Sequence, residues 1–146
     1  MKTLDETDRR ILHLLEANGR IDIKEIAREV GMSGPGAGER VRRLERMGVI
    51  ERFTVRIDPA ALGRPLEAIV RVKPRPGNMH IVESMIVGEP RFTACDKVTG
   101  EDCFVARLSF ARVQDLDAIL GPFHDRAETH TSIVKSSPVR ARLPLA

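Results

Sequence analysis

The chain has 146 residues, of which 42% are hydrophobic and 31% are charged, a balance that suits one ordinary globular domain or two small ones. It has no run of about 18 apolar residues and its start is charged, so we expect no membrane span, no signal peptide and a cytoplasmic location. A net charge of +3 is too small to indicate nucleic-acid binding by itself, and the absence of Trp and Tyr argues against stacking on single strands.

Three helical patterns open the chain. The first runs from Asp5, a good N-cap, to about Asn18, where Asn18-Gly19 ends it. The second runs from about Ile23 to Val30 with apolar residues at i, i+3, i+4 and i+7, and Asp22 with Glu25 resembles a capping box. Each helix therefore has one apolar face to bury.

The third helix follows a tight turn. Gly31-Met32 makes the turn, Ser33 is the expected N-cap, and the helix runs to about Met47, where Gly48 stops it. The inward stripe is Ala37, Val41 and Leu44. Two short helices joined by a turn that contains glycine are typical of a helix-turn-helix.

A change of pattern marks the middle of the chain. Residues 50–57 alternate and are rich in β-branched side chains, which predicts a strand. Asp58-Pro59 to Gly63 predicts a turn, which we take as the boundary between a domain at 1–63 and a domain at 64–146.

The second domain has a β-α-β-β-α-β pattern, which is that of a ferredoxin-like fold. The predicted elements are a strand with Leu66, Ala68, Val70 and Val72 inward; a helix capped by Asn78 with Ile81, Val82, Met85 and Ile86 inward; a hairpin of Arg91–Val98 and Asp102–Ala111 about Thr99-Gly100; a helix from Asp115 to about Leu120, ended by Gly121-Pro122; and a strand from Thr129 to Lys135, before a tail at 136–146.

The predicted sheet has apolar residues on both faces. Phe104, Ala106, Leu108 and Phe110 would face the helices, whereas Cys103, Val105, Arg107 and Ile69 would lie on the other side. A sheet that is apolar on both faces needs a second cover, and the chain has no helix left to supply one. We therefore expect a homodimer.

The third helix also carries the strongest candidate site. At 100° per residue, Gly36, Glu39, Arg43 and Arg46 lie on its outer face, with Arg42 beside them and Arg40 nearer the core. Guanidinium groups with few compensating acids suit phosphate and guanine edges, so the partner expected is double-stranded DNA. Replacing Arg43 should weaken that binding and lower its salt dependence. The candidate DNA-binding residues are Ser33, Gly34, Gly36, Glu39, Arg40, Arg42, Arg43 and Arg46.

The start of this helix is rich in glycine. Small residues at a helix N-terminus allow a phosphate to come close to the backbone N–H groups, but the GxxxxGK[ST] nucleotide loop is absent. The alternative is that Pro35 suits the first turn and the glycines only weaken the helix, at about 1 kcal/mol each. In that case the helix start would be loosely ordered until DNA binds.

Catalytic and metal patterns are poor. Cys95 and Cys103 form no CxxC pair and are expected to be reduced, and the four histidines are scattered. Asp96, Glu101 and Asp102 cluster at the predicted hairpin, where acids are usually only solvated. We therefore expect that the protein binds no cofactor and no metal and is not an enzyme.

The motifs along the chain resemble the Lrp/AsnC family of feast/famine regulators. The segments that carry the resemblance are Leu4-Asp5 with Asp8 and Ile11-Leu12, Glu16–Arg20, Val30–Ser33, Arg40–Glu45, Gly48–Ile50, Asp58-Pro59, Leu62-Gly63, Val98–Phe104 and Thr131–Val134. Cys103, where many members have an acid, and the glycine-rich start of the third helix depart from the family pattern.

The resemblance implies an α+β protein with an N-terminal winged helix-turn-helix and a C-terminal ferredoxin-like βαββαβ domain. It also implies dimers built through the C-terminal sheets, often assembled into octamers, and a small effector, commonly an amino acid, bound between dimers near the hairpin. Carried over to this chain, the ligand-binding candidates are Gly100, Glu101, Asp102, Cys103, Thr129 and Thr131.

Two other functions remain open. Proteins similar in fold to this family include sirohaem decarboxylases, which would need a tetrapyrrole cleft with Arg and His. The chain could also be an amino-acid sensor that binds no DNA and uses the C-terminal domain alone.

Overall fold

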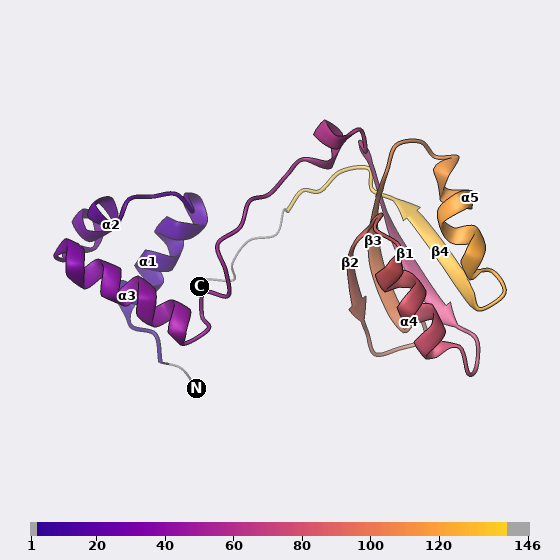
Figure 1. Cartoon of the computed structure of the whole chain (residues 1–146), viewed down its shortest axis with the longest axis horizontal. Helices are drawn as coiled ribbons and strands as arrows, with labels where there is room; N and C mark the ends of the chain where they lie inside the picture. The colour runs from indigo at the N-terminus through magenta and orange to yellow at the C-terminus, as the bar shows by residue number, and fades with distance from the viewer. Residues whose placement is uncertain (1–2, 140–146) are drawn as a thin grey trace. The chain divides into compact units, whose positions relative to one another are not determined.

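The computed structural model describes residues 3–139, so the last part of the predicted tail, 140–146, lies outside the described residues. The chain divides into two compact units, one of helices up to Arg56 and one built on a sheet from Ile57 to Pro138 (Figure 1). The boundary between residues 63 and 64 stays a prediction. In the part of the chain that the structure describes, no helix has the length and apolarity needed to cross a bilayer.

The first unit contains the three predicted helices, α1 (Glu6–Ala17), α2 (Ile23–Val30) and α3 (Gly34–Arg46). Gly31 makes the predicted turn between α2 and α3 with a φ of 68°, a conformation that glycine adopts without a steric penalty. The core contains the predicted inward stripe of α3 and consists of Ile11, Leu12, Ile26, Ala27, Ala37, Val41 and Leu44. The helix-turn-helix prediction is therefore confirmed.

The caps explain why these helices begin where they do. The Asp5 carboxylate accepts a hydrogen bond from the Asp8 amide at 2.8 Å, and the Asp8 carboxylate accepts one from the Asp5 amide at 3.1 Å, which completes a capping box at α1. Asp22 caps α2 by accepting from the Lys24 amide. The capping box predicted there is wrong, because Glu25 accepts instead from Arg28 at 3.4 Å.

The strand predicted at residues 50–57 does not form. Residues 51–58 are extended but pair with no other segment among the described residues. Phe53, Val55 and Ile57 are 50%, 77% and 60% exposed. Alternating apolar and polar side chains show that a segment could have two different faces as a strand. A strand also needs a partner segment for its backbone N–H and C=O groups.

The second unit is an antiparallel four-stranded sheet with strand order β2-β3-β1-β4. This order confirms the ferredoxin-like prediction, although the last strand begins two residues earlier than Thr129. Its elements in chain order are the short 3-10 helix η1 (Pro59–Leu62), β1 (Leu66–Pro74), α4 (Met79–Gly88), β2 (Phe92–Lys97), β3 (Phe104–Phe110), α5 (Asp115–Leu120), the 3-10 helix η2 (Gly121–Phe123) and β4 (Ala127–Ile133).

Helices α4 and α5 pack on one face of this sheet. The buried alternate residues of β1 and β3 lie on that face, as predicted, and form one core with Val82, Ile86, Ile119 and Leu120. Ile81 was predicted to point inward but is 43% exposed, and Asn78 makes no side-chain cap. The core is therefore one-sided, and the other face of the sheet has no cover within the described chain.

One residue changes sides relative to the prediction. Cys103 packs against the core cluster instead of lying on the open face, because its φ of 59° breaks the alternation just before β3. Val105 and Ile69 do lie opposite the helices and are half-buried, and Arg107 forms an ion pair with Glu67 at 3.1 Å. The open face is thus a mixture of aliphatic groups and ion pairs.

Candidate functional site

The candidate DNA-binding residues all lie on α3 or at its start. Ser33 is the N-cap, and its hydroxyl accepts a hydrogen bond from the Gly36 amide at 3.3 Å. The helix begins at Gly34 in spite of its glycines. The cap and the buried stripe of Ala37, Val41 and Leu44 therefore suffice to form it.

The glycines of α3 have different surroundings. A Cβ added at Gly34 would meet nothing within 4 Å, and one at Gly38 would lie 3.6 Å from Ile23 Cγ2, an ordinary contact. At Gly36 it would lie 3.1 Å from Ser33 Oγ and 3.3 Å from Met32 Cε, closer than most real contacts. A side chain at Gly36 would thus need its neighbours to shift slightly, whereas one at Gly34 or Gly38 would meet no close contact.

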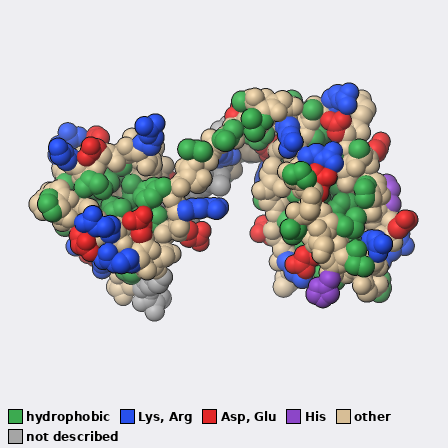
Figure 2. All heavy atoms as spheres, viewed as in Figure 1, with side chains coloured by type: hydrophobic (Ala, Val, Ile, Leu, Met, Phe, Trp, Pro, Cys, Tyr) green, Lys and Arg blue, Asp and Glu red, His purple; other side chains and the backbone are tan. Residues whose placement is uncertain are grey.

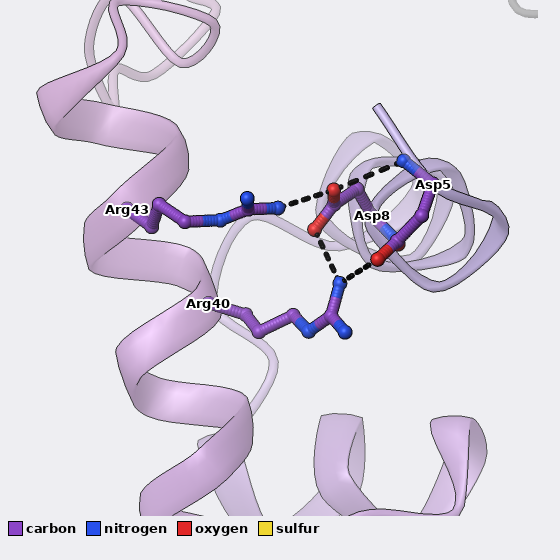
Figure 3. Close-up of polar contacts among 4 residues, drawn as sticks. All are labelled: Asp5, Asp8, Arg40 and Arg43. Atoms are coloured by element: carbon purple, nitrogen blue, oxygen red, sulfur yellow. Dashed lines mark hydrogen bonds and ion pairs between the residues drawn. The ribbon is translucent and has the colours of Figure 1, made fainter. Parts of the chain in front are cut away.

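Two of the candidate arginines hold α3 against the start of α1. Arg40 donates to both Asp5 and Asp8, at 3.0 Å to the latter, and Arg43 donates to the other oxygen of Asp8 at 2.5 Å (Figure 3). The Asp8 side chain is fully buried, while those of Arg40 and Arg43 are 28% and 41% exposed. We call these four residues the α1–α3 ion cluster.

Both carboxylates of the cluster have a lowered pKa, so they stay ionised at a lower pH than ordinary aspartates do. Burial alone would raise the pKa of Asp8, but the hydrogen bonds from Arg43 and Arg40 outweigh it, and the pKa is lowered. The hydrogen bond from Arg40 is the main reason that the pKa of Asp5 is lowered, and the same bonds raise the pKa of Arg40. The cluster is a charged contact between helices at neutral pH.

The remaining candidates form a second, exposed cluster on α3. Glu39 accepts from Arg42 at 3.3 Å and from Arg46 at 2.6 Å. The side chain of Glu39 is 57% exposed, and those of both arginines are 61% exposed. The hydrogen bonds from Arg46 and then Arg42 lower the pKa of Glu39. We call Glu39, Arg42 and Arg46 the outer triad.

The prediction of few compensating acids is wrong. Four guanidinium groups of α3 face three carboxylates, two of them contributed by α1. The surface of both units shows the same mixture, with Lys and Arg side chains interspersed among Asp and Glu on the face drawn in Figure 2. The net charge of these paired groups on α3 is therefore small, and Arg42 and Arg46 are the more exposed of its four arginines.

The effector candidates lie at one end of the sheet. Gly100, with a φ of 116°, and Cys103, with a φ of 59°, shape the turn between β2 and β3, and the Val98 amide donates to the Cys103 carbonyl at 2.8 Å. Asp102 faces Arg71 at 3.7 Å and Glu101 faces Lys73 at the same distance. The turn thus brings two acidic side chains close to two basic side chains of β1.

Thr129 and Thr131 are brought to a different side of the sheet. They pair with Val72 and Val70 of β1, so they share the helix-covered face with these valines. Arg71 lies between the two valines on the strand and projects from the open face. The hairpin and Thr129 therefore meet at the same end of the sheet but on opposite faces.

Prediction from sequence missed four charged residues: Asp5 and Asp8 as partners of the α3 arginines, and Arg71 and Lys73 as partners of the hairpin acids. The alternation of β1 puts Arg71 and Lys73 on its polar face, so that pattern could have found them. Nothing local links Asp8 to Arg43, which is 35 residues away.

Taken together, a helix-turn-helix with exposed arginines and a separate ferredoxin-like domain define a two-domain DNA-binding regulator. The family model for winged helix-turn-helix DNA-binding domains matches residues 4–51, and the model for the Lrp/AsnC ligand binding domain matches residues 67–144. The chain belongs to the Lrp/AsnC family, and it is a DNA-binding transcriptional regulator of that type.

Relatives and solved structures agree over nearly the whole chain. The HTH-type transcriptional regulator FL11 of Pyrococcus horikoshii is 32% identical over 97% of this chain and 97% of its own. The structure of LrpC of Bacillus subtilis is 25% identical with a TM-score of 0.88, covering 95% of this chain and 99% of its own. The feast or famine regulatory protein of M. tuberculosis, complexed with L-methionine, is 28% identical with a TM-score of 0.88, covering 99% of this chain and 100% of its own.

Proposed function

We propose that this regulator binds the DNA major groove with the exposed face of α3, through Arg42 and Arg46. The observation that carries the proposal is the 61% exposure of both arginine side chains, whose hydrogen bonds go to Glu39 of the same helix. Arg40 and Arg43 play a different part, since their guanidinium groups are turned toward Asp5 and Asp8 (Figure 3). Ser33, Gly34 and Gly36 would lie at the end of α3 that approaches a phosphate.

A salt titration tests this assignment. Arg46→Ala should weaken binding to DNA and reduce the slope of log K against log salt by about 1, because one phosphate contact is lost. Arg112→Ala is the matched control, since it removes the same charge from an exposed i,i+3 ion pair with Asp115 in the other unit. Equal effects of the two substitutions in fluorescence anisotropy would contradict the role of α3.

We also propose that the regulator responds to an amino acid or a related metabolite. Support comes from the L-methionine complex of the relative from M. tuberculosis, and from the charges around the turn. At 3.7 Å, the pairs Arg71–Asp102 and Lys73–Glu101 are loose enough to exchange partners with a carboxylate and an ammonium group. Gly100 and Cys103 would shape the turn that carries the two acids, whereas Thr129 and Thr131 lie on the opposite face of the sheet and outside this site.

Calorimetry with a panel of amino acids tests the effector. At least one should bind the wild type, and Asp102→Asn should weaken that binding at least tenfold while leaving the far-UV spectrum unchanged. Asp117→Asn is the control, because Asp117 is an exposed acid of α5, which packs on the other face of the sheet. If Asp102→Asn and Asp117→Asn bound the effector equally, the hairpin assignment would be wrong.

The assembly we propose is a cytoplasmic homodimer joined through the open face of the sheet, or a homo-octamer made of four such dimers. Support comes from Ile69 and Val105, which are half-buried on a face that no helix of the described chain covers. Such a dimer would present two recognition helices to DNA roughly 10 bp apart or a multiple of it. Sedimentation equilibrium of Val105→Asp, which should dissociate to monomers, tests this.

The proposal assigns no catalytic step to the chain. The residues described hold no cluster of three or more His, Cys, Asp or Glu that could bind a metal ion. An absorbance scan with added sirohaem tests the enzyme alternative, which would require a spectral change on binding and conversion.

A further inference from the structure

The start of the recognition helix is almost without hydrogen-bonding side chains. After Ser33, the next five residues are Gly34, Pro35, Gly36, Ala37 and Gly38, and Glu39 is the first that carries polar side-chain atoms. Recognition helices contact base edges mainly with the residues near their N-termini. If α3 enters the groove, Glu39 is therefore the first side chain on the helix that can reach a base edge with a hydrogen bond.

The surroundings of Glu39 restrict what it can bind. A carboxylate near DNA is repelled by phosphates, and the groups in the major groove that can donate to it are exocyclic amines, chiefly cytosine N4. Arg42 and Arg46 each bond one oxygen of Glu39, at 3.3 and 2.6 Å, so they fix its orientation and offset its charge. Each carboxylate oxygen still has a free lone pair, because an ionised carboxylate has about four acceptor positions.

We propose that Glu39 determines the base specificity of this regulator by accepting a hydrogen bond from cytosine N4, with Arg42 and Arg46 holding the carboxylate in place. This inference rests on the proposed function of α3. It assigns the three residues of the outer triad different parts: Glu39 selects the base, and the arginines position it and supply affinity. Ala37 and Gly38 are buried in the helical core. The small exposed surface of Gly34, Pro35 and Gly36 would let the backbone approach the groove closely enough for a short acidic side chain to reach.

The competing explanation is an ordinary solvated ion pair. The pair of Glu39 with Arg42 has i,i+3 spacing, and such exposed pairs contribute little to helix stability. Under that explanation, removing the carboxylate would free two arginines and strengthen binding to all DNA equally. Under our inference, it would strengthen binding to non-specific DNA but abolish one base preference.

The experiment is selection from a random double-stranded DNA library with the full-length wild type, Glu39→Ala, Glu39→Gln and Arg46→Ala. The wild-type motif should contain one preferred cytosine per half-site. Glu39→Ala should lose a discrimination of about 5- to 150-fold at that position only, which is the range for one mismatched base pair in a specific site. Glu39→Gln should shift the preference to adenine, which Gln bonds through N6 and N7.

The outcomes separate the two levels of the argument. Identical motifs for wild type and Glu39→Ala, or no enriched motif for the wild type, would overturn the inference about Glu39. If Arg46→Ala bound every selected site as tightly as the wild type, the proposed function of α3 itself would fail. Circular dichroism checks that each variant folds, which is expected because Glu39 is 57% exposed and both of its ion pairs lie within its own helix.

Discussion

Asp8→Asn should destabilise the helical unit by about 2–4 kcal/mol, because Asp8 is the one charged residue of the described chain that is buried. Its fully buried carboxylate accepts from Arg40 at 3.0 Å and from Arg43 at 2.5 Å. Hydrogen bonds to charged groups contribute about 1.5–3 kcal/mol each, so two give about 3–6 kcal/mol. In the variant, the two arginines regain some water and the side-chain oxygen of asparagine can still accept one hydrogen bond. These two effects reduce the loss to about 2–4 kcal/mol.

The assay must be circular dichroism at 222 nm in urea, because the chain contains no Trp or Tyr for intrinsic fluorescence. The matched control is Glu25→Gln, which breaks an ion pair with Arg28 whose two side chains are 51% and 72% exposed. Such a pair contributes about 0–1 kcal/mol, so the control should unfold almost like the wild type.

A result in which both variants lose the same small amount would refute the reasoning. It would mean that the α1–α3 ion cluster is energetically equivalent to a solvated surface pair. If Asp8→Asn lost as much free energy of unfolding as a large core truncation does, the re-solvation assumed above would be wrong. Arg40 and Arg43 would then stay desolvated after their partner becomes neutral.

Three further predictions follow from the same structure. Because the pKa of Asp8 is lowered on folding, its contribution to stability should be complete above its unfolded pKa of about 3.9 and be lost as the pH falls through its folded pKa, so the gap between wild type and Asp8→Asn should close in melts below about pH 4. Gly38→Ala should stabilise α3 by about 1 kcal/mol in urea titrations, whereas Gly36→Ala should gain less or lose, because its Cβ would lie 3.1 Å from Ser33 Oγ. Burial, then Asp96 and Glu83, raise the pKa of the Cys95 thiol, so in a Cys103→Ala background Cys95 should react with an aromatic disulfide more slowly than free cysteine at pH 7.5, and Glu83→Gln should quicken it.

The helical half of the chain was predictable because its signals are local. Asp5, Asp22 and Ser33 each stand where a helix begins, and Gly31 stands where a turn requires a positive φ. Caps and turns depend on residues within about four positions along the chain, so a short stretch of sequence is enough to predict them. The two faces of β1 were equally predictable, since strand alternation has a period of two.

The failures share a different cause, which is dependence on a distant partner. The segment at 50–57 has the composition of a strand but nothing to pair with among the described residues. The ion pair of Arg43 with Asp8 was not foreseen either, because the two residues are 35 positions apart in the chain. The alternation of strand side chains placed Cys103 on the wrong face. Its positive φ breaks that alternation, and a positive φ at a residue other than glycine cannot be predicted from a two-residue period.

The division of the α3 arginines explains how a recognition helix with a weak start can hold its orientation. Three glycines in the first two turns lower helix propensity, and the N-cap of Ser33 offsets only part of that loss. Arg40 and Arg43 attach the middle of α3 to the buried carboxylate of α1, so the helix is oriented from its centre and its start stays bare. A helix held in this way can present a backbone without side chains to the groove, and base selection then rests on the few polar groups that follow, beginning with Glu39.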